Sequence, residues 1–290
     1  MEKKKTAVPA YLGVAAVWIG SHFGPGFATG AFSVRWYVKY GWVGLVTPLL
    51  AMLITGGVMY FMLEYAREHG TPNYRPFARS CYGEKLGGVV AVLYDICFLM
   101  TMMCAGGLAF SGEGKLLQGF LGVNYWATAI VTILISAALC LYGSKLLAKS
   151  SGYLITILLM VCLIFTLFSY TNVFDVCAET LPVMSVLNRL GMKWLQWLYV
   201  ILMTLAVLTS AAGLAHAGNV RFDGLFRFIK NAQLRRFVIT AILLGIAAVG
   251  AALGFQAMLQ QGTSIVGWAA IPIVVIPAFT IVASKVRKAK

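Results

Sequence analysis

Apolar residues fill long, nearly uninterrupted stretches of this chain, and charged residues gather in the segments between them. A helix needs about 20 apolar residues to cross a bilayer, and a window of about 19 residues locates such stretches. Eight are found, at 10–33, 42–65, 87–111, 124–142, 150–170, 194–217, 237–258 and 264–284. The pattern predicts an all-α integral membrane protein with eight transmembrane helices, forming a single transmembrane domain over 1–290.

Composition strengthens this interpretation. Of the 290 residues, 60% are hydrophobic and 11% are charged, whereas charged residues make up about 25% of a soluble protein. No small-residue cleavage motif follows the first apolar stretch, so we expect no cleavable signal peptide. The six cysteines contain no C-x-x-C pair, so neither a disulfide framework nor a metal cage is expected.

Three longer segments separate the predicted helices. We expect a loop at 66–86, and irregular chain with a short helix at 171–193. Segment 218–236 alternates aromatic and basic residues, which indicates either a piece lying on the membrane surface or a solvated loop. Glu64 and Arg67, at the end of the second predicted helix, have the spacing of a surface ion pair.

Basic residues lie mainly on one side of the predicted helices. With the N-terminus inside, five of the 23 lysines and arginines fall outside, namely Arg35, Lys39, Lys115, Arg189 and Lys193. Because positive residues favour the cytoplasmic side, both termini are expected in the cytoplasm, with the chain in the cell (inner) membrane. The net charge of +14 then belongs to loops that face anionic lipid, and we expect no nucleic-acid partner.

The sequence FGPGFATG, at 23–30, interrupts the first predicted helix. Proline removes a backbone donor and glycine eases departure from the helix, so this helix is expected to break near Phe23 to Gly26. In lipid a broken helix survives only where it is buried or lines a polar cavity, and transporters bind solutes there. The pattern predicts a substrate site formed by His22, Phe23, Gly24, Gly26, Phe27, Ala28 and Thr29. The alternatives are a simple kink, and a His22 ring that only satisfies the freed backbone.

Two motifs resemble one family. GPGFATG resembles the G-A-G-F-A-T-G-Q-E signature of YkvI-type membrane proteins of the amino acid–polyamine–organocation (APC) superfamily, although Ala31 and Phe32 replace its Gln-Glu. LAVLTSAA, at 205–212, resembles the eighth helix of that family, where an alanine and a following Thr-Ser pair help to bind sodium. The resemblance implies a leucine-transporter-like fold with a broken first helix. It also implies a sodium site formed by Gly20, Phe23, Ala206, Thr209 and Ser210. Alternatively, Thr209 and Ser210 serve only helix packing and internal hydrogen bonds.

The family has ten core helices in two inverted repeats, and this chain offers eight. If 194–217 matches the eighth helix, the sixth and seventh helices of the family are missing, and the tail with Pro272 and Pro277 matches its last core helix. The sixth helix normally supplies half of the substrate site. Either a second copy of the chain completes the cavity, which predicts a homodimer, or the site is more open and the cargo different.

Ionisable residues at membrane depth are candidates for function. Asp95 is the deepest carboxylate, and it either binds a cationic substrate, relays a proton or bonds to a neighbouring helix. Glu113 follows 18 residues later, about five helical turns on and so on the same face. We expect Glu113 near the outer boundary, neutralised by Lys115 or Lys39.

Lys149 begins the fifth predicted helix. In some proton-coupled members of the APC superfamily a lysine on this helix reaches towards the sodium position, so the resemblance implies a proton-coupling role for Lys149. The alternative is that its side chain extends to the lipid headgroups.

Together these features favour a secondary active transporter. It would move a small organic solute, an amino acid or amine, by alternating access, coupled to a sodium or proton gradient. No cofactor is implied other than a possible Na⁺ ion. The alternative function is a non-transporting membrane scaffold or receptor with a degenerate transporter fold, which the missing helices favour. The chain contains no H-E-x-x-H or G-x-S-x-G motif, so we do not expect an enzyme.

Overall fold

The computed structural model describes residues 25–71, 73–142 and 178–289, and all regular structure within these ranges is helical. Six helices there are long and apolar enough to cross a membrane: Val43–Glu68, Glu84–Leu121, Tyr125–Tyr142, Lys193–Phe222, Ala232–Leu253 and Phe255–Arg287. Each coincides with one predicted span. The predicted span 150–170 and most of 10–33 lie outside the described residues, so the count of eight stays a prediction. The chain is an all-α, multi-pass membrane protein.

The described elements follow one another as short and long helices, with one 3₁₀ segment and four π-helical segments between them. They are α2 (Pro25–Ala28), α3 (Ala31–Trp36), η1 (Val38–Tyr40), α4 (Val43–Glu68), α5 (Tyr74–Tyr82), α6 (Glu84–Thr101), η2 (Met102–Gly106), α7 (Gly107–Leu121), α8 (Tyr125–Tyr142), α10 (Pro182–Leu190), α11 (Lys193–Phe222), α12 (Ala232–Leu253), α13 (Phe255–Ala257), η4 (Met258–Gly262), α14 (Thr263–Ala270), η5 (Ile271–Val275), η6 (Ala278–Val282) and α15 (Ala283–Ala289).

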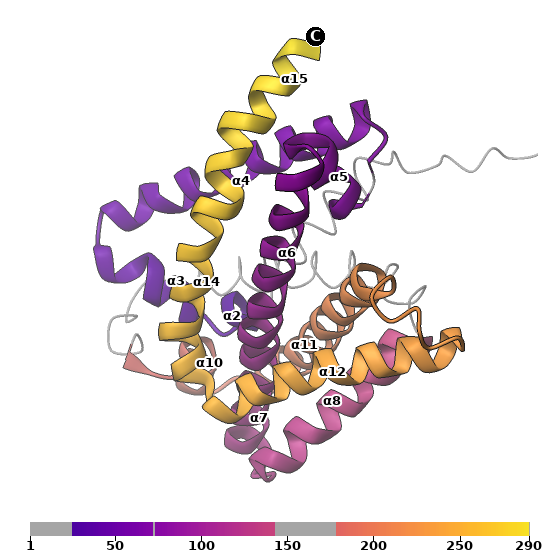
Figure 1. Ribbon diagram of the computed structural model, residues 1–290. Helices are drawn as coiled ribbons and strands as arrows, with labels where there is room; N and C mark the ends of the chain where they lie inside the picture. Colours follow the sequence, from indigo (N-terminus) through magenta and orange to yellow (C-terminus); the bar gives the residue numbers. More distant parts are fainter. Residues whose placement is uncertain (1–24, 72, 143–177, 290) are drawn as a thin grey trace, which may run out of the picture.

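One half of the molecule is a close-packed core made by α7, α8, α11 and α12, which occupy the lower part of Figure 1. Phe110, Met203 and Leu243 fill its centre and are almost fully buried. Glycine brings two backbones together here, because a Cβ built on Gly107 would lie 2.7 Å from the carbonyl carbon of Gly250. Small residues at helix crossings allow this approach, as is common between membrane helices.

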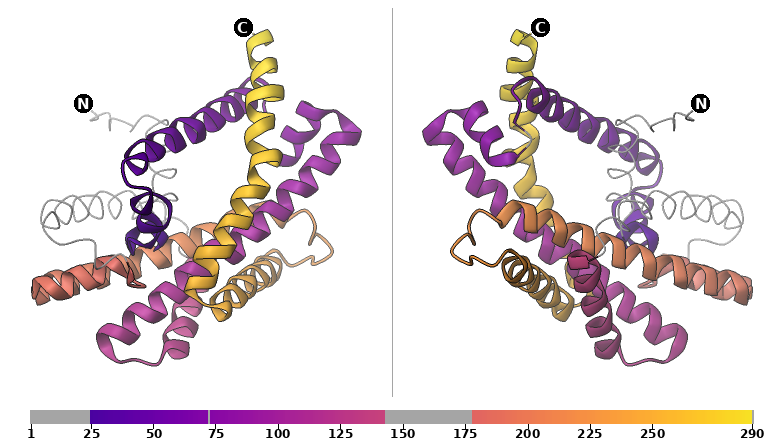
Figure 2. Two further views of the ribbon diagram at one scale, coloured as in Figure 1. Left: turned by 90° about the vertical axis from the view of Figure 1, so that its left-hand side faces the viewer. Right: turned by 90° about the vertical axis from the view of Figure 1, so that its right-hand side faces the viewer.

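The other half is formed by α4, α5, α6 and the helix from α13 to α15. Figure 1 shows α4, α5 and α15 gathered in its upper part, and Figure 2 shows the C-terminal helix crossing α6. A second apolar cluster, which includes Tyr65, Phe77, Tyr94 and Val282, holds these helices together. Figure 2 also shows that α6 and α7 form one long helix that connects the two halves.

The first predicted helix departs from expectation where it is described. The break was expected near Phe23 to Gly26, but within the described residues the chain leaves the helix at Thr29 and Gly30, between α2 and α3. Gly30 has φ +79°, a conformation that residues with a Cβ rarely adopt. The Thr29 hydroxyl donates to the carbonyl of Gly26 at 2.9 Å and so satisfies part of the freed backbone. The described break in the first predicted helix therefore lies a few residues after the predicted position.

The segments between long helices are more ordered than the sequence indicated. Segment 66–86, expected as a loop, contains α5, whose residues Phe77, Ala78 and Cys81 are buried. The short helix expected within 171–193 is confirmed as α10. Segment 218–236 is partly helical, since α11 continues to Phe222, and α12 begins after Asn231, whose side chain caps it.

Candidate functional site

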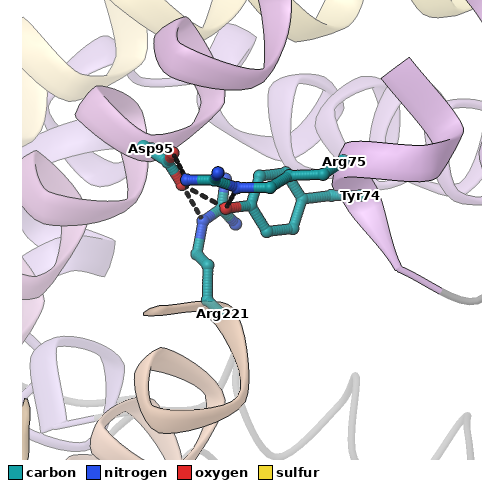
Figure 3. Close-up of polar contacts among 4 residues, drawn as sticks. All are labelled: Tyr74, Arg75, Asp95 and Arg221. Carbon is teal, nitrogen blue, oxygen red and sulfur yellow. Dashed lines mark hydrogen bonds and ion pairs between the residues drawn. The ribbon is translucent and has the colours of Figure 1, made fainter. Parts of the chain in front are cut away.

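Four polar residues from three helices form a cluster, called here the Asp95 cluster: Tyr74, Arg75, Asp95 and Arg221. Figure 3 shows Tyr74 and Arg75 reaching Asp95 from α5, while Arg221 approaches from the end of α11. Asp95 Oδ1 accepts from the Tyr74 hydroxyl at 2.5 Å and from Arg221 Nε at 2.9 Å, and Oδ2 accepts from Arg75 Nη2 at 2.9 Å. Both carboxylate oxygens are therefore occupied.

The charges in this cluster do not cancel. Two guanidinium groups face one carboxylate, and the side chains of Asp95 and Arg221 are only 12% and 16% exposed. The Arg221 guanidinium lies 3.6 Å from the centroid of the Tyr74 ring, a favourable cation–π position. Arg221 Nη2 is buried and has no hydrogen-bond partner among the residues that the structure describes. The cluster thus carries an excess positive charge and one unused donor.

Tyr74 lies outside the candidate membrane helices, in the first turn of α5. Burial raises the pKa of its phenol above the ordinary value of 10.0, and the Asp95 carboxylate acts in the same direction. A hydrogen bond from Arg75 Nε to the phenol oxygen, at 2.8 Å, opposes the shift. The net effect keeps the proton on Tyr74 at neutral pH, where it donates to Asp95.

A cleft of about 410 Å³ opens beside the Asp95 cluster. Its walls come from α4, α5, α6, α11 and the C-terminal helix, and they are mainly apolar, with Leu63, Phe98 and Val266 among the lining residues. Tyr74 and Arg221 also line the cleft and bring the polar chemistry to it. An apolar chamber with a few convergent polar groups is typical of a small-molecule site.

Glu113 occupies a different environment, inside the close-packed core. Its side chain is fully buried, and its Oε1 lies 2.5 Å from the hydroxyl oxygen of Thr204 on α11. Oε2 has no hydrogen-bond partner among the described residues. Glu113 is also less exposed than Asp95, at 0% against 8%.

The expected neutralisation of Glu113 by a lysine is not what the structure shows. Among the described residues neither Lys39 nor Lys115 forms an ion pair with it. The reason for Lys115 is geometric, because two residues along a helix turn the side chain by about 200°. Glu113 points to α11 instead, as Asp95 does through Arg221.

The break in the first helix lies against the helices that hold this carboxylate. Helix α2 packs against both α7 and α11, the two helices that carry Glu113 and Thr204. Thr29 is fully buried, and a Cβ on Gly112 would lie 4.0 Å from its methyl group. The predicted substrate residues Gly26, Phe27, Ala28 and Thr29 thus belong to the segment that packs on α7 and α11, and none of them lines the cleft.

The other predicted residues are only partly described. Gly20, His22, Phe23, Gly24 and Lys149 lie outside the described residues. The Thr209 hydroxyl contacts two carbonyls of its own helix, Leu205 at 2.9 Å and Ala206 at 3.2 Å, as the packing alternative predicts. Ser210 is half-buried on the same helix. The five-oxygen sodium site stays a prediction.

Sequence reasoning did not select Tyr74, Arg75, Arg221 or Thr204 as site residues. Arg221 lies 126 residues from Asp95 along the chain, and no local pattern pairs them. One usable signal was present. The charge pattern put Arg75 and Arg221 on the cytoplasmic side, where the helix that carries Asp95 begins. A carboxylate near that end of the helix could therefore be expected to find a basic partner.

Comparison with known proteins gives one weak relative to report. No family model matches the chain, and no solved structure matches it. The chain is 22% identical over 155 residues to a Bacillus subtilis (strain 168) protein described as "Uncharacterized membrane protein YkvI". The match covers 52% of this chain and 42% of that protein, so the chain spans less than half of its relative. This similarity supports a membrane protein.

Proposed function

We propose that the chain is a secondary active transporter that moves a small organic solute across the membrane by alternating access. The observation that carries the proposal is the cleft of about 410 Å³ between the candidate membrane helices. Its volume lies within the range of about 300–1,000 Å³ in which small-molecule sites occur. The walls belong to separate helices whose relative movement would open and close it.

The chemistry of the cleft favours one of the two expected solute classes. The Asp95 cluster adds an excess positive charge, and Arg221 has an unused donor at Nη2. A guanidinium group recognises carboxylates through charge-assisted hydrogen bonds. The carboxylate of an amino acid fits this wall better than an amine, and the apolar walls would receive an apolar side chain.

The break between α2 and α3 supports the same proposal. Non-helical backbone in a membrane helix is costly unless it is buried or lines a cavity, and transporters use such breaks as binding and moving parts. Here α2, which precedes the break, packs against α7 and α11, and α7 carries the buried Glu113. A leucine-transporter-like fold, suggested by the GPGFATG and LAVLTSAA motifs, belongs to this proposal.

The experiment is uptake into proteoliposomes that contain the purified chain. Radiolabelled amino acids and amines are offered under an imposed sodium or proton gradient. Val266→Trp fills the cleft, whereas Ile265→Trp changes the neighbouring residue, which is 57% exposed, on the same helix. We expect saturable uptake of at least one amino acid, a loss of tenfold or more in Val266→Trp, and normal uptake in Ile265→Trp.

Two results would contradict the proposal. Equal uptake by the two tryptophan variants would show that the cleft is not on the transport path. Saturable binding without gradient-driven uptake of any tested solute would favour the scaffold or receptor instead.

The coupling ion is tested in the same vesicles. If sodium binds at Thr209 and Ser210, Thr209→Val and Ser210→Ala should each weaken sodium-driven uptake tenfold or more, or about 1.4 kcal/mol. If Lys149 carries a proton, Lys149→Ala should abolish pH-driven uptake while sodium has no effect.

We also propose that the chain forms a homodimer. Leu45, Leu49 and Leu53 repeat every fourth residue on α4 and are 64%, 66% and 71% exposed, which gives a partner chain an apolar face. A cysteine at Leu49 should crosslink between copies in native membranes. Leu63, which lines the cleft, gives the control position. If a cysteine at Leu49 crosslinks no more than one at Leu63, lipid rather than a second chain covers this face of α4.

A further inference from the structure

The contacts of Thr204 restrict the protonation of Glu113. The Thr204 hydroxyl oxygen lies 2.5 Å from Glu113 Oε1 and 2.9 Å from the carbonyl oxygen of Val200. A hydroxyl has one hydrogen, so it can donate to only one of these two acceptors. With Glu113 ionised, the other pair would be two oxygens at hydrogen-bond distance without a hydrogen between them.

A protonated Glu113 removes this conflict. The O–H group of the acid donates to Thr204, and the Thr204 hydroxyl donates onward to Val200. The distance of 2.5 Å is at the short end of the range for O–H···O hydrogen bonds. The geometry thus favours the neutral acid at Glu113.

Burial leads to the same assignment. The side chain is fully buried, Oε2 lacks a partner among the described residues, and no ion pair to it is found there. Removing an ion from water costs several kcal/mol in a protein unless partners compensate. A single hydroxyl compensates little, whereas Asp95 has two arginines and a phenol.

Charged and titratable groups on the described helices packed against α7 do not change this balance. They are Lys193, Tyr199, His216 and Arg221 on α11, Arg235 and Arg236 on α12, Tyr125, Cys140 and Tyr142 on α8, and Cys104 in η2. Arg221 pairs with Asp95, Arg235 pairs with Asp223, and the Tyr125 hydroxyl donates to the carbonyl of Ala251 at 3.0 Å. α2, α13 and η4 contribute no titratable group.

We propose that Glu113 binds the proton that couples transport to a pH gradient. It holds the proton in the conformation described here and releases it when α2 and α3 move away from α7 and α11. On release, the O–H bond of the acid breaks and an entering water molecule accepts the proton. The Thr204 hydroxyl then turns from Val200 to the carboxylate. This inference rests on the proposed transport function, and it assigns the coupling proton to Glu113 rather than to Lys149.

The first test needs no solute. Infrared difference spectra of the purified chain, recorded across a pH titration, should contain a carboxylic-acid C=O band that disappears in Glu113→Gln. Thr204→Val should shift this band, because it removes the group to which the acid is hydrogen-bonded. Glu64→Gln is the control, since Glu64 forms a surface pair with Arg67 and should leave the band unchanged. Absence of a band that depends on Glu113 would overturn the proposal.

The second test uses a mixture of the standard radiolabelled amino acids as the probe. Glu113→Gln keeps the side chain neutral, so exchange of labelled for unlabelled amino acids should continue, while accumulation driven by a pH gradient should fall tenfold or more. Accumulation equal to the wild type would overturn the coupling role. If the wild type transports none of these amino acids, the proposed function and the coupling role fail together, and the infrared band alone decides whether Glu113 binds a proton.

Discussion

Asp95 and Glu113 lie on one continuous helix, 18 residues and so about 27 Å apart along its axis, yet their surroundings differ in every respect. Asp95 accepts hydrogen bonds from two arginines and a tyrosine at the edge of a cleft. Glu113 contacts one threonine hydroxyl within a close-packed core. The comparison shows how tertiary partners set the state of a carboxylate in a membrane helix. Partners from distant parts of the chain decide whether it is an ion-paired carboxylate or a neutral acid.

Packing explains why the partners differ. In the core that contains Glu113, Gly107 and Gly250 bring α7 and α12 into backbone contact, and no basic side chain of the described residues pairs with Glu113. Around Asp95, the ends of α5 and α11 meet at the side of the molecule where basic residues concentrate. The Asp95 cluster therefore joins α11 of the close-packed core to α5 and α6 of the other half, whereas Glu113 lies within the core.

The largest expected effect is at Asp95. Asp95→Ala leaves Arg221 buried without its carboxylate, and breaking such a pair costs about 4 kcal/mol in the free energy of unfolding. Chemical denaturation in detergent micelles measures this loss. Glu64→Ala, which removes a surface pair with Arg67, should leave the unfolding free energy nearly unchanged. Adding Arg221→Met to Asp95→Ala should recover much of the loss, and no recovery would mean that the buried arginine is not its cause.

Next in size is the glycine contact in the core around Glu113. A side chain at Gly250 would overlap the carbonyl of Met103, so Gly250→Leu should separate α12 from η2 at a cost of about 3 kcal/mol. Gly245→Leu is the matched control on the same helix, because nothing lies within 4 Å of its Cβ position. The control variant should be slightly more stable than the wild type, because leucine is a better helix former than glycine. Similar unfolding free energies for the two variants would contradict the close packing.

A smaller effect is expected at Glu113 itself. Glu113→Gln replaces a neutral acid by a neutral amide of the same shape, which can still donate to Thr204, so unfolding should change by less than about 1 kcal/mol. Asp95→Asn makes the same chemical change and should cost far more, because it removes a charge that two arginines require. Equal losses in these two variants would show that both carboxylates are ionised.

The smallest effect concerns Tyr74 and appears only at high pH. Because its pKa is raised in the folded state, the phenol contributes stability below pH 10.0 that is lost as the pH rises through the folded pKa. The wild type should therefore lose stability more steeply above about pH 10 than Tyr74→Phe does. Thermal unfolding of both proteins across this pH range measures the difference. Parallel curves of stability against pH would show that the Tyr74 phenol makes no such contribution.

The sequence allowed the long helices to be located because an apolar run shows its membrane character without tertiary partners. It also correctly indicated the local pair of Glu64 and Arg67. It failed where polar residues become buried together. Helix α11 extends beyond the predicted 217, and Asn219 and Arg221, which lower the hydropathy of a window, donate hydrogen bonds to Thr240 and Asp95.

The candidate sites show the same limit. Glu113 could be recognised as an ionisable residue in an apolar stretch. Its burial depends on α11, where its partner Thr204 lies 91 residues further along the chain. The position of the helix break could be predicted only approximately. The described part of α2 ends at Ala28, and Gly30, with φ +79°, separates it from α3.

The π-helical segment η2 lies between the two carboxylates, and a second one, η4, packs against it where a Cβ on Gly262 would lie 3.0 Å from the sulfur of Cys104. A π turn holds one residue more than an α turn. If that extra residue moves to a neighbouring turn, each residue it passes rotates by about 100° and shifts by about 1.5 Å, while both ends of the helix keep their contacts. Such a migrating turn would rotate Phe98 and Thr101 in the cleft wall without breaking the helix that carries Glu113. A shift of the π turn along the long helix would then couple the gain or loss of a proton at Glu113 to the orientation of side chains in the cleft wall.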